Sequence, residues 1–170
     1  MKALVVYYSE SQNTQKLAEA IAAGLGTQAL GLEAVDPRSL ADYDLVCIGT
    51  PVQYAAPARK VREFIERMPV MTGKKAAAFC TMHMFGARNT LQVLQRSLEA
   101  RGMAFLGGCS ALGWSRLVGN FGPRIFNRGR PDRAELERAT DFGRSLLARM
   151  EQPPAGRREA PAGPSPGLHA

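Results

Sequence analysis

Residues 2–14, KALVVYYSESQNT, decide how the rest of the chain is interpreted. Residues 2–8 form a short run of β-branched and aromatic side chains, which is typical of a β-strand. Residues 9–14 are almost entirely polar and precede a segment with helical periodicity. That segment, residues 16–26, has apolar side chains at the spacing of one helix face: Leu17, Ala18, Ile21 and Leu25. The stretch therefore predicts a strand, a polar loop and a helix, in that order.

The same alternation continues along the chain. Further strands are expected at residues 29–35, 43–49, 75–81 and 103–112. Helices are expected at residues 57–68, at 88–101, and after Asp132, which is suited to cap the last helix. Strands that alternate with helices predict right-handed crossovers, and therefore an α/β fold with a three-layer, doubly wound sheet of five parallel strands. Such sheets bind ligands beyond the carboxyl ends of their strands, so the loops after the strands are examined first.

Length and composition fit one domain over residues 1–150. The chain has 170 residues, enough to bury a core without disulfides or a structural metal. Residues 151–170 are rich in proline, glycine and alanine, and we expect this tail to be disordered because it cannot build a core. No apolar run approaches the roughly 18 residues of a membrane span, and no cleavage site follows the apolar opening. We therefore expect a cytoplasmic protein without a membrane partner.

The cysteines, the histidines and the net charge limit which kinds of site and partner the chain can have. Cys47, Cys80 and Cys109 contain no CxxC pair and lie in or beside apolar runs, so we expect buried free thiols. Two histidines cannot form a metal-ligand cluster by spacing, and no metal is predicted. The net charge is +7, and its basic excess lies in residues 51–150. This excess makes an acidic protein or a nucleic acid a candidate partner.

The polar loop between the first strand and helix is the strongest chemical signal. Its sequence SESQNT concentrates hydroxyls and amides at a helix N-terminus, where backbone N–H groups and the helix dipole favour an anion. It contains no lysine or arginine, and neither GxxxxGK[ST] nor GxGxxG is present. These features predict a phosphate held by neutral donors. The alternative is an ordinary helix N-cap, because hydroxyl and amide residues are preferred there in any protein.

Three loops together resemble those of the flavodoxin family. SESQNT is similar to the family's phosphate loop, (S/T)xTGNT, with Gln12 in place of the usual glycine. Residues 49–54, GTPVQY, resemble the G(S/T)PxY loop that contacts the flavin ring, and residues 80–86, CTMHMFG, resemble the other flavin-side loop. The segment GRPDRAELERATDFGRSL is similar to the family's closing helix. The resemblance spans residues 1–150 in the family's order and implies strand order 2-1-3-4-5 and flavin mononucleotide (FMN) as cofactor.

The resemblance also implies which residues bind FMN. The expected cofactor-binding residues are Ser9, Ser11, Gln12, Asn13, Thr14, Thr50, Pro51, Val52, Tyr54, Thr81, Met82, His83, Phe85 and Gly86. Tyr54 either stacks on the flavin or is a partly exposed tyrosine at a helix entry, and Phe85 either covers the ring or lies in the core. Thr81 either reaches the ribityl chain or ends its strand. No catalytic residue is assigned, although His83 either tunes the flavin or is a surface histidine without a role.

One departure from the family concerns charge. Flavodoxins that carry electrons are generally acidic around the ring, whereas here basic residues follow the second and third loops: Arg59, Lys60, Arg62 and Arg88. Positive charge near the ring would raise the potential of the reduced state. The same residues are equally well explained as charges on a helix surface.

Two classes of function remain open. The first is a flavoprotein that moves electrons, either as a carrier for a redox partner protein or as an FMN-dependent oxidoreductase that uses NAD(P)H and a small acceptor. The second is a non-catalytic module whose basic face binds an acidic protein or nucleic acid, although no RNA-binding motif accompanies the aromatic residues of the arginine-rich loop, residues 113–131. That loop either receives a nucleotide phosphate or an acidic partner, or is simply solvated. Hydrolase chemistry is supported less well than either class, because Ser9 has no identifiable histidine–carboxylate pair. A homo-oligomer remains open.

Overall fold

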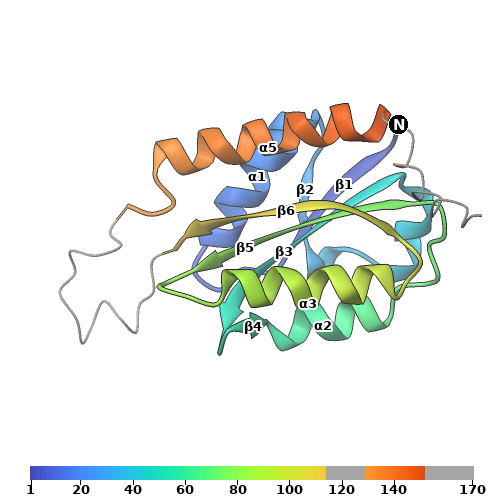
Figure 1. Ribbon diagram of the computed structural model, residues 1–170, viewed down its shortest axis with the longest axis horizontal. Helices are drawn as coiled ribbons and strands as arrows, with labels where there is room; N and C mark the ends of the chain where they lie inside the picture. The colour runs from blue at the N-terminus through green and yellow to red at the C-terminus, as the bar shows by residue number, and fades with distance from the viewer. Residues whose placement is uncertain (114–128, 152–170) are drawn as a thin grey trace, which may run out of the picture.

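Parallel strands and helices alternate along the chain in the computed structural model, which describes residues 1–113 and 129–151 (Figure 1). The strands are β1 (Ala3–Tyr7), β2 (Ala29–Gly31), β3 (Leu45–Gln53), β4 (Ala56–Pro57), β5 (Lys75–Met82) and β6 (Ala104–Leu112). The α-helices are α1 (Asn13–Leu25), α2 (Arg59–Glu66), α3 (Ala87–Glu99) and α5 (Arg133–Glu151). Two short 3₁₀ helices follow β2: η1 (Leu32–Ala34) and η2 (Pro37–Asp42).

The sheet has the order β2-β1-β3-β5-β6, and every neighbouring pair along this path is parallel. The two-residue β4 lies off the path and pairs antiparallel with the end of β3. Counted without β4, the order is 2-1-3-4-5, so the predicted three-layer, doubly wound parallel fold is confirmed. The carboxyl ends of β1, β3 and β5 therefore lie side by side at one rim of the sheet.

Two apolar layers cover the two faces of the sheet because side chains alternate along each strand. In β1, Leu4 and Val6 belong to the cluster that packs against α2 and α3, whereas Val5 belongs to the cluster under α1 and α5. Figure 1 shows α1 with α5 on one face and α2 with α3 on the other. In the described helices, even the 19-residue α5 has no apolar stretch suited to crossing a bilayer.

Helices α1 and α5 approach each other closely at two glycines. A Cβ atom at Gly24 would overlap the carbonyl oxygen of Thr140, and one at Gly143 would overlap the carbonyl oxygen of Ile21. Only glycine permits this approach, and it fixes α5 across the face of the sheet that carries α1.

The start of α5 agrees with the predicted cap and adds a buried carboxylate. Asp132 Oδ1 accepts a hydrogen bond from Glu135 N, and Glu135 Oε2 accepts one from Asp132 N, both at 2.9 Å. This reciprocal pair is a capping box. The other oxygen of Glu135 accepts from the backbone N–H of Leu112, also at 2.9 Å, and ties the helix start to the end of β6.

Several predicted boundaries are wrong. The third strand was expected to end at Gly49 but continues to Gln53, and Pro57 lies in β4 instead of the first turn of α2. The second strand stops at Gly31. Helix α1 begins at Asn13, inside the stretch predicted to be a loop. Of the arginine-rich loop, residues 114–128 lie outside the described part of the chain, as does the tail from residue 152 onward.

Candidate functional site

Three loops meet at the carboxyl ends of β1, β3 and β5. They are the first loop together with the first two residues of α1 (residues 8–14), the hairpin (residues 50–57) and the third loop (residues 83–86). Gln53 Nε2 donates to Glu10 Oε1 at 3.0 Å and joins the hairpin to the first loop. Asn89 Nδ2, at the start of α3, donates to Ala55 O at 2.8 Å and joins the hairpin to the third-loop side. The predicted convergence of these loops is thus a feature of the fold.

The first loop presents an uncapped helix start. Gln12 occupies the N-cap position with φ 63° and ψ −2°, and no side chain caps the helix there. This left-handed conformation is one that glycine adopts readily, so Gln12 keeps the local turn although it replaces the family's glycine. The first N–H groups of α1 and the positive end of its dipole therefore face the loop, an arrangement suited to an anion.

Ser9 supplies the clearest unmet polar group of the site. Its hydroxyl oxygen is buried and has no hydrogen-bond partner among the described residues. A buried hydroxyl without a partner costs free energy, so such groups are rare and often mark a ligand position. Nearby, Asn13 is buried and its Nδ2 donates to Ser11 Oγ at 2.8 Å, while Ser11 and Gln12 are exposed. The loop offers neutral donors, as the sequence predicted.

A buried hydroxyl pair connects the first loop to β5. Thr14 Oγ1 and Thr81 Oγ1 lie 2.8 Å apart, and the two residues are 1% and 5% exposed. Two hydroxyls have two protons, of which their mutual hydrogen bond uses one. One O–H group of the pair can therefore donate to a third group. Thr81 is thus hydrogen-bonded directly to Thr14 of the predicted phosphate loop.

The hairpin is held by the hydroxyl of Thr50. This buried Oγ1 accepts from Ala58 N and donates to Pro51 O, both at 2.9 Å, so its proton is already used within the protein. Pro51 and Val52 are half-buried beside it, whereas Tyr54 at the tip is fully exposed. Tyr54 and Ala55 both have positive φ, 51° and 59°. Two adjacent left-handed residues other than glycine are strained by roughly 1–3 kcal/mol each, a feature common at functional sites.

The third loop is anchored to the end of β6. His83 Nδ1 donates to Gly113 O at 2.8 Å, because a carbonyl oxygen can only accept, and Gly113 N donates to Met82 O at 2.8 Å. A Cβ atom on Gly113 would lie 3.0 Å from Asn13 Nδ2, so this glycine also packs against the first loop. His83 is therefore half-buried, and its ring is held by a hydrogen bond. Gly113 was not among the predicted site residues, and the sequence carries no signal for its role.

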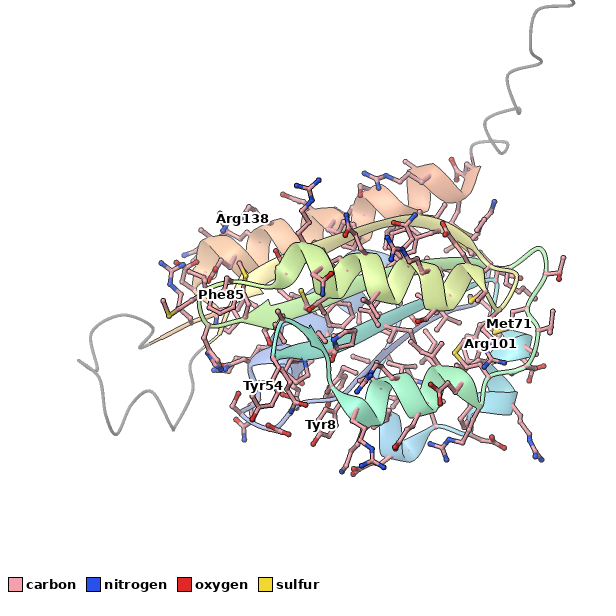
Figure 2. The ribbon with its side chains drawn as sticks, turned by 60° about the horizontal axis from the view of Figure 1, so that its bottom comes forward. Tyr8, Tyr54, Met71, Phe85, Arg101 and Arg138 are labelled. Atoms are coloured by element: carbon pink, nitrogen blue, oxygen red, sulfur yellow. The ribbon has the colours of Figure 1, made fainter. Side chains whose placement is uncertain are left out.

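Large apolar side chains stand exposed around the loops. Met84 and Phe85 are 80% and 72% exposed, and Tyr54 is fully so. Figure 2 shows Tyr54 and Phe85 at the same end of the molecule. The interpretation of Phe85 as a core residue is wrong, and so is that of Tyr54 as a helix-entry residue, since it forms a hairpin turn. Gly86, with φ 96°, packs its backbone against Ala55 and Val52.

Tyr8 is surrounded by a polar network that the sequence did not predict. Tyr8 Oη donates to Glu10 Oε1 at 3.0 Å, and Lys60 Nζ lies 5.0 Å from the centroid of the Tyr8 ring. Burial and the hydrogen bond to Glu10 raise the pKa of Tyr8. Lys60 is also ion-paired with Glu33 at 2.9 Å, and this hydrogen bond raises its pKa. No periodicity or motif in the sequence indicates these contacts, and those of Lys60 with Tyr8 and Glu33 join residues far apart along the chain.

Of the four basic residues that follow the second and third loops, Arg59 and Lys60 form surface ion pairs. Arg59 pairs with Glu63 one helical turn away at 2.6 Å, and both side chains are exposed. Together with the Lys60–Glu33 pair, this favours the interpretation of the α2 cations as helix-surface charges. Arg62 and Arg88 are also exposed.

The cysteines take no part in the loops. Cys47 and Cys80 are buried free thiols, but Cys109 is only half-buried because β6 is the edge strand, so its predicted burial is wrong in degree. Burial raises the pKa of Cys80 and that of Cys109 to about 12, which keeps both thiols protonated at neutral pH. Within the described residues, no group of three His, Cys, Asp or Glu side chains is placed to hold a metal ion.

Comparisons with known proteins agree with this architecture. A family model described as a flavodoxin domain matches residues 4–108. An uncharacterized protein of Methanocaldococcus jannaschii is 27% identical over 154 residues, covering 86% of this chain and 99% of that protein. A flavodoxin of Clostridium saccharobutylicum is 27% identical over 123 residues, covering 66% and 77% of the two chains.

An enzyme and a solved structure are also similar to this chain. An NAD(P)H dehydrogenase (quinone) of Chromohalobacter salexigens is 29% identical over 150 residues, which cover 65% of this chain and 74% of that protein. Among solved structures, a flavodoxin from the domain Archaea superposes with a TM-score of 0.70 at 20% sequence identity. The superposition covers 89% of this chain and 100% of that one.

Proposed function

Because this chain belongs to the flavodoxin domain family, we propose that its three loops bind FMN and that the protein transfers electrons through the bound flavin. The observation that carries the proposal is the buried, unpartnered hydroxyl of Ser9 beside the uncapped start of α1. Both features offer hydrogen bonds to an anion without offering a positive side chain. FMN has one anionic group, its phosphate, and the rest of the molecule is neutral.

The donors of the first loop fit the phosphate end. Ser9, Ser11, Gln12, Asn13 and Thr14 surround the start of α1, and the Thr14–Thr81 pair has one O–H group left to donate. Neutral donors and a helix N-terminus hold a phosphate without a lysine. We therefore assign these residues to the phosphate and the adjoining polar chain.

The hairpin and the third loop fit the flat ring. A ring of this kind needs apolar walls and a few backbone hydrogen bonds at its edge. The walls are assigned to Pro51, Val52, Tyr54, Met82, Phe85 and Gly86, while Thr50 acts by holding the hairpin in shape. When bound, FMN supplies one- and two-electron chemistry that no side chain of the protein can perform. His83, held by Gly113, is assigned to favour negative charge on the reduced ring.

Two forms of this function are distinguished by the electron donor. A carrier exchanges electrons with a partner protein, as the name of the Clostridium relative suggests, whereas a reductase takes them from NADH or NADPH, as the name of the Chromohalobacter relative suggests. The exposed Tyr54, Met84 and Phe85 support contact with a second molecule at this end of the chain. The alternative function, a non-catalytic module that binds nucleic acid through a basic face, is less well supported by the described residues. Two of the basic residues of that face, Arg59 and Lys60, are ion-paired with carboxylates.

The test is a titration of the flavin-free protein with FMN and with riboflavin, followed by flavin fluorescence. We expect FMN to bind at least about tenfold more tightly, because hydrogen bonds to a charged phosphate contribute on the order of 1.5–3 kcal/mol each. Binding of neither flavin would refute the proposal. Anaerobic addition of NADH or NADPH to the loaded protein then separates the two forms, since only a reductase loses its flavin absorbance rapidly.

A further inference from the structure

The hairpin turn is not specified by its own residues. Strands β3 and β4 pair Gln53 with Ala56, which leaves Tyr54 and Ala55 as the two turn residues. Both have positive φ, the pattern of a type I′ turn. Such turns favour asparagine and glycine, which tolerate left-handed backbone, and neither occurs here. Contacts from outside the hairpin must therefore hold this turn in place.

The start of α3 supplies those contacts. Asn89 Nδ2 donates to the carbonyl oxygen of Ala55 at 2.8 Å, across 34 residues of sequence. Below this bond, the backbone of Gly86 packs so closely against the turn that a Cβ atom would lie 2.8 Å from Ala55 Cα. Asn89 is exposed and lies on the helix surface, so it is not needed to fill the core. Its side-chain hydrogen bond is made to the turn.

This bond ties the hairpin, which carries Tyr54, to the first turn of α3, directly after the loop that carries Phe85. Tyr54 precedes the carbonyl that Asn89 holds, and Phe85 precedes Gly86 in the third loop. Burial does not restrain either ring, because Tyr54 is fully exposed and Phe85 is 72% exposed. Their relative placement therefore depends on how the backbone of one loop is fixed to the other. Figure 2 shows both rings at the same end of the molecule.

We propose that Asn89 is a positioning residue that sets the distance between the loop carrying Tyr54 and the loop carrying Phe85, and thereby the grip of the site on a flat aromatic ligand. The proposal rests on the proposed function and adds a determinant for the ring portion of FMN, separate from the phosphate donors. Asn89 acts through the Ala55 carbonyl and requires an N–H donor at its side-chain end. An aspartate of the same shape cannot supply that donor at neutral pH.

The experiment compares Asn89→Ala and Asn89→Asp with the unaltered protein, using FMN and riboflavin as ligands. Gln92→Ala, on the exposed surface of α3 further along the helix, is the matched control. We expect both Asn89 variants to weaken FMN and riboflavin by the same factor, about threefold to tenfold, as expected for one hydrogen bond. The visible circular dichroism of bound flavin should also change, because the ring lies between displaced walls. Gln92→Ala should leave both readouts unchanged.

The outcomes separate this proposal from the one on which it rests. If the unaltered protein binds both flavins and Asn89→Ala changes neither affinity nor spectrum, the role of Asn89 is refuted while FMN binding stands. A loss confined to FMN would also refute it, because the effect would then lie at the phosphate. If the unaltered protein binds neither flavin, the proposed function fails, and the role of Asn89 fails with it.

Discussion

The two ends of the sheet are formed by the same strands, but they differ in how their polar groups are hydrogen-bonded and in which residues have left-handed backbone. At the amino end, Lys2 N donates to Asp44 Oδ2 at 2.8 Å, and the guanidinium group of Arg101 donates to the carbonyl oxygens of Met68 and Glu66 at 3.2 and 2.6 Å. The left-handed turns there are made by glycine, at Gly26, Gly73 and Gly102. Figure 2 shows Arg101 and Met71 at the end opposite Tyr54 and Phe85.

The carboxyl end differs, although it too has a left-handed glycine, Gly86 with φ 96°. In the described part of the chain, the non-glycine residues with positive φ are Gln12, Tyr54 and Ala55, and all of them belong to the converging loops. The Ser9 hydroxyl is buried there without a partner. Strain and unmet hydrogen bonds lower stability and persist where they serve a function. The difference between the ends therefore supports placing the proposed site at the carboxyl end.

The largest expected effect concerns the Thr14–Thr81 pair. Thr14→Val leaves the buried Thr81 hydroxyl without its partner and should lower the free energy of unfolding by about 1–3 kcal/mol in urea denaturation. Thr14→Val combined with Thr81→Val should recover most of that loss, because no hydroxyl is then unpaired, yet FMN binding should remain weak in both. The matched control is Thr72→Val at the amino end, which is exposed and should change neither quantity. Full recovery of FMN affinity in the double variant would contradict the assignment.

A smaller effect is expected when left-handed residues are replaced, and the change in the free energy of unfolding should have opposite signs at the two ends. Gly102→Ala forces alanine to φ 83° and places its Cβ 3.0 Å from Thr72 Oγ1, so the free energy of unfolding should fall by about 1–2 kcal/mol. Ala55→Gly relieves a left-handed alanine, and after the entropy cost of glycine it should raise that free energy by about 0.5 kcal/mol. Thermal or urea unfolding of the flavin-free variants measures both. If both substitutions destabilise the protein, the strain assigned to the hairpin is wrong.

The smallest effect is expected in acid, at the amino end. The hydrogen bond from the Lys2 backbone lowers the pKa of Asp44 below its ordinary value of 3.8. Because the pKa of Asp44 is lower in the folded protein, this carboxyl group adds to the free energy of unfolding. Its contribution is complete above pH 3.8 and is lost as the pH falls through the pKa of the folded protein. Below about pH 4, the unfolding free energy of the unaltered protein should therefore fall more steeply than that of Asp44→Asn. Equal slopes for the two proteins would contradict this role of Asp44.

Most of the fold could be predicted because its signals are local. The alternation of apolar strands and periodic helices gave the layers correctly, and Asp132 with Glu135 three residues later is a capping signal that the structure bears out. The 3₁₀ helix η2 is not among the predicted elements, although Asp36 at its N-cap and Pro37 at its first position are helix-start signals. The start of α1 at Asn13 was hidden by the polar composition of the loop.

The hairpin and the contacts around it could not be predicted from local signals. Residues 50–57 contain no glycine or asparagine to indicate a turn, because Asn89 and Gly86, distant in sequence, hold it. The same holds for Gly113, which enters the site only because β6 ends beside the first and third loops. The role of Glu10 likewise depends on Gln53, 43 residues away. Motifs located the loops, but tertiary contacts determine which groups inside them are left to bind a ligand.

The Ser9 hydroxyl tests most directly whether the carboxyl end is built for a phosphate. Ser9→Ala removes a buried group that has no partner in the folded protein, so the free energy of unfolding of the flavin-free chain should stay unchanged or rise by up to about 1 kcal/mol. The same variant should bind FMN about 10- to 100-fold more weakly, with riboflavin affinity unchanged, because a hydrogen bond to the charged phosphate is lost. Lower stability together with unchanged FMN affinity would show that Ser9 serves the fold and would contradict the proposed phosphate site.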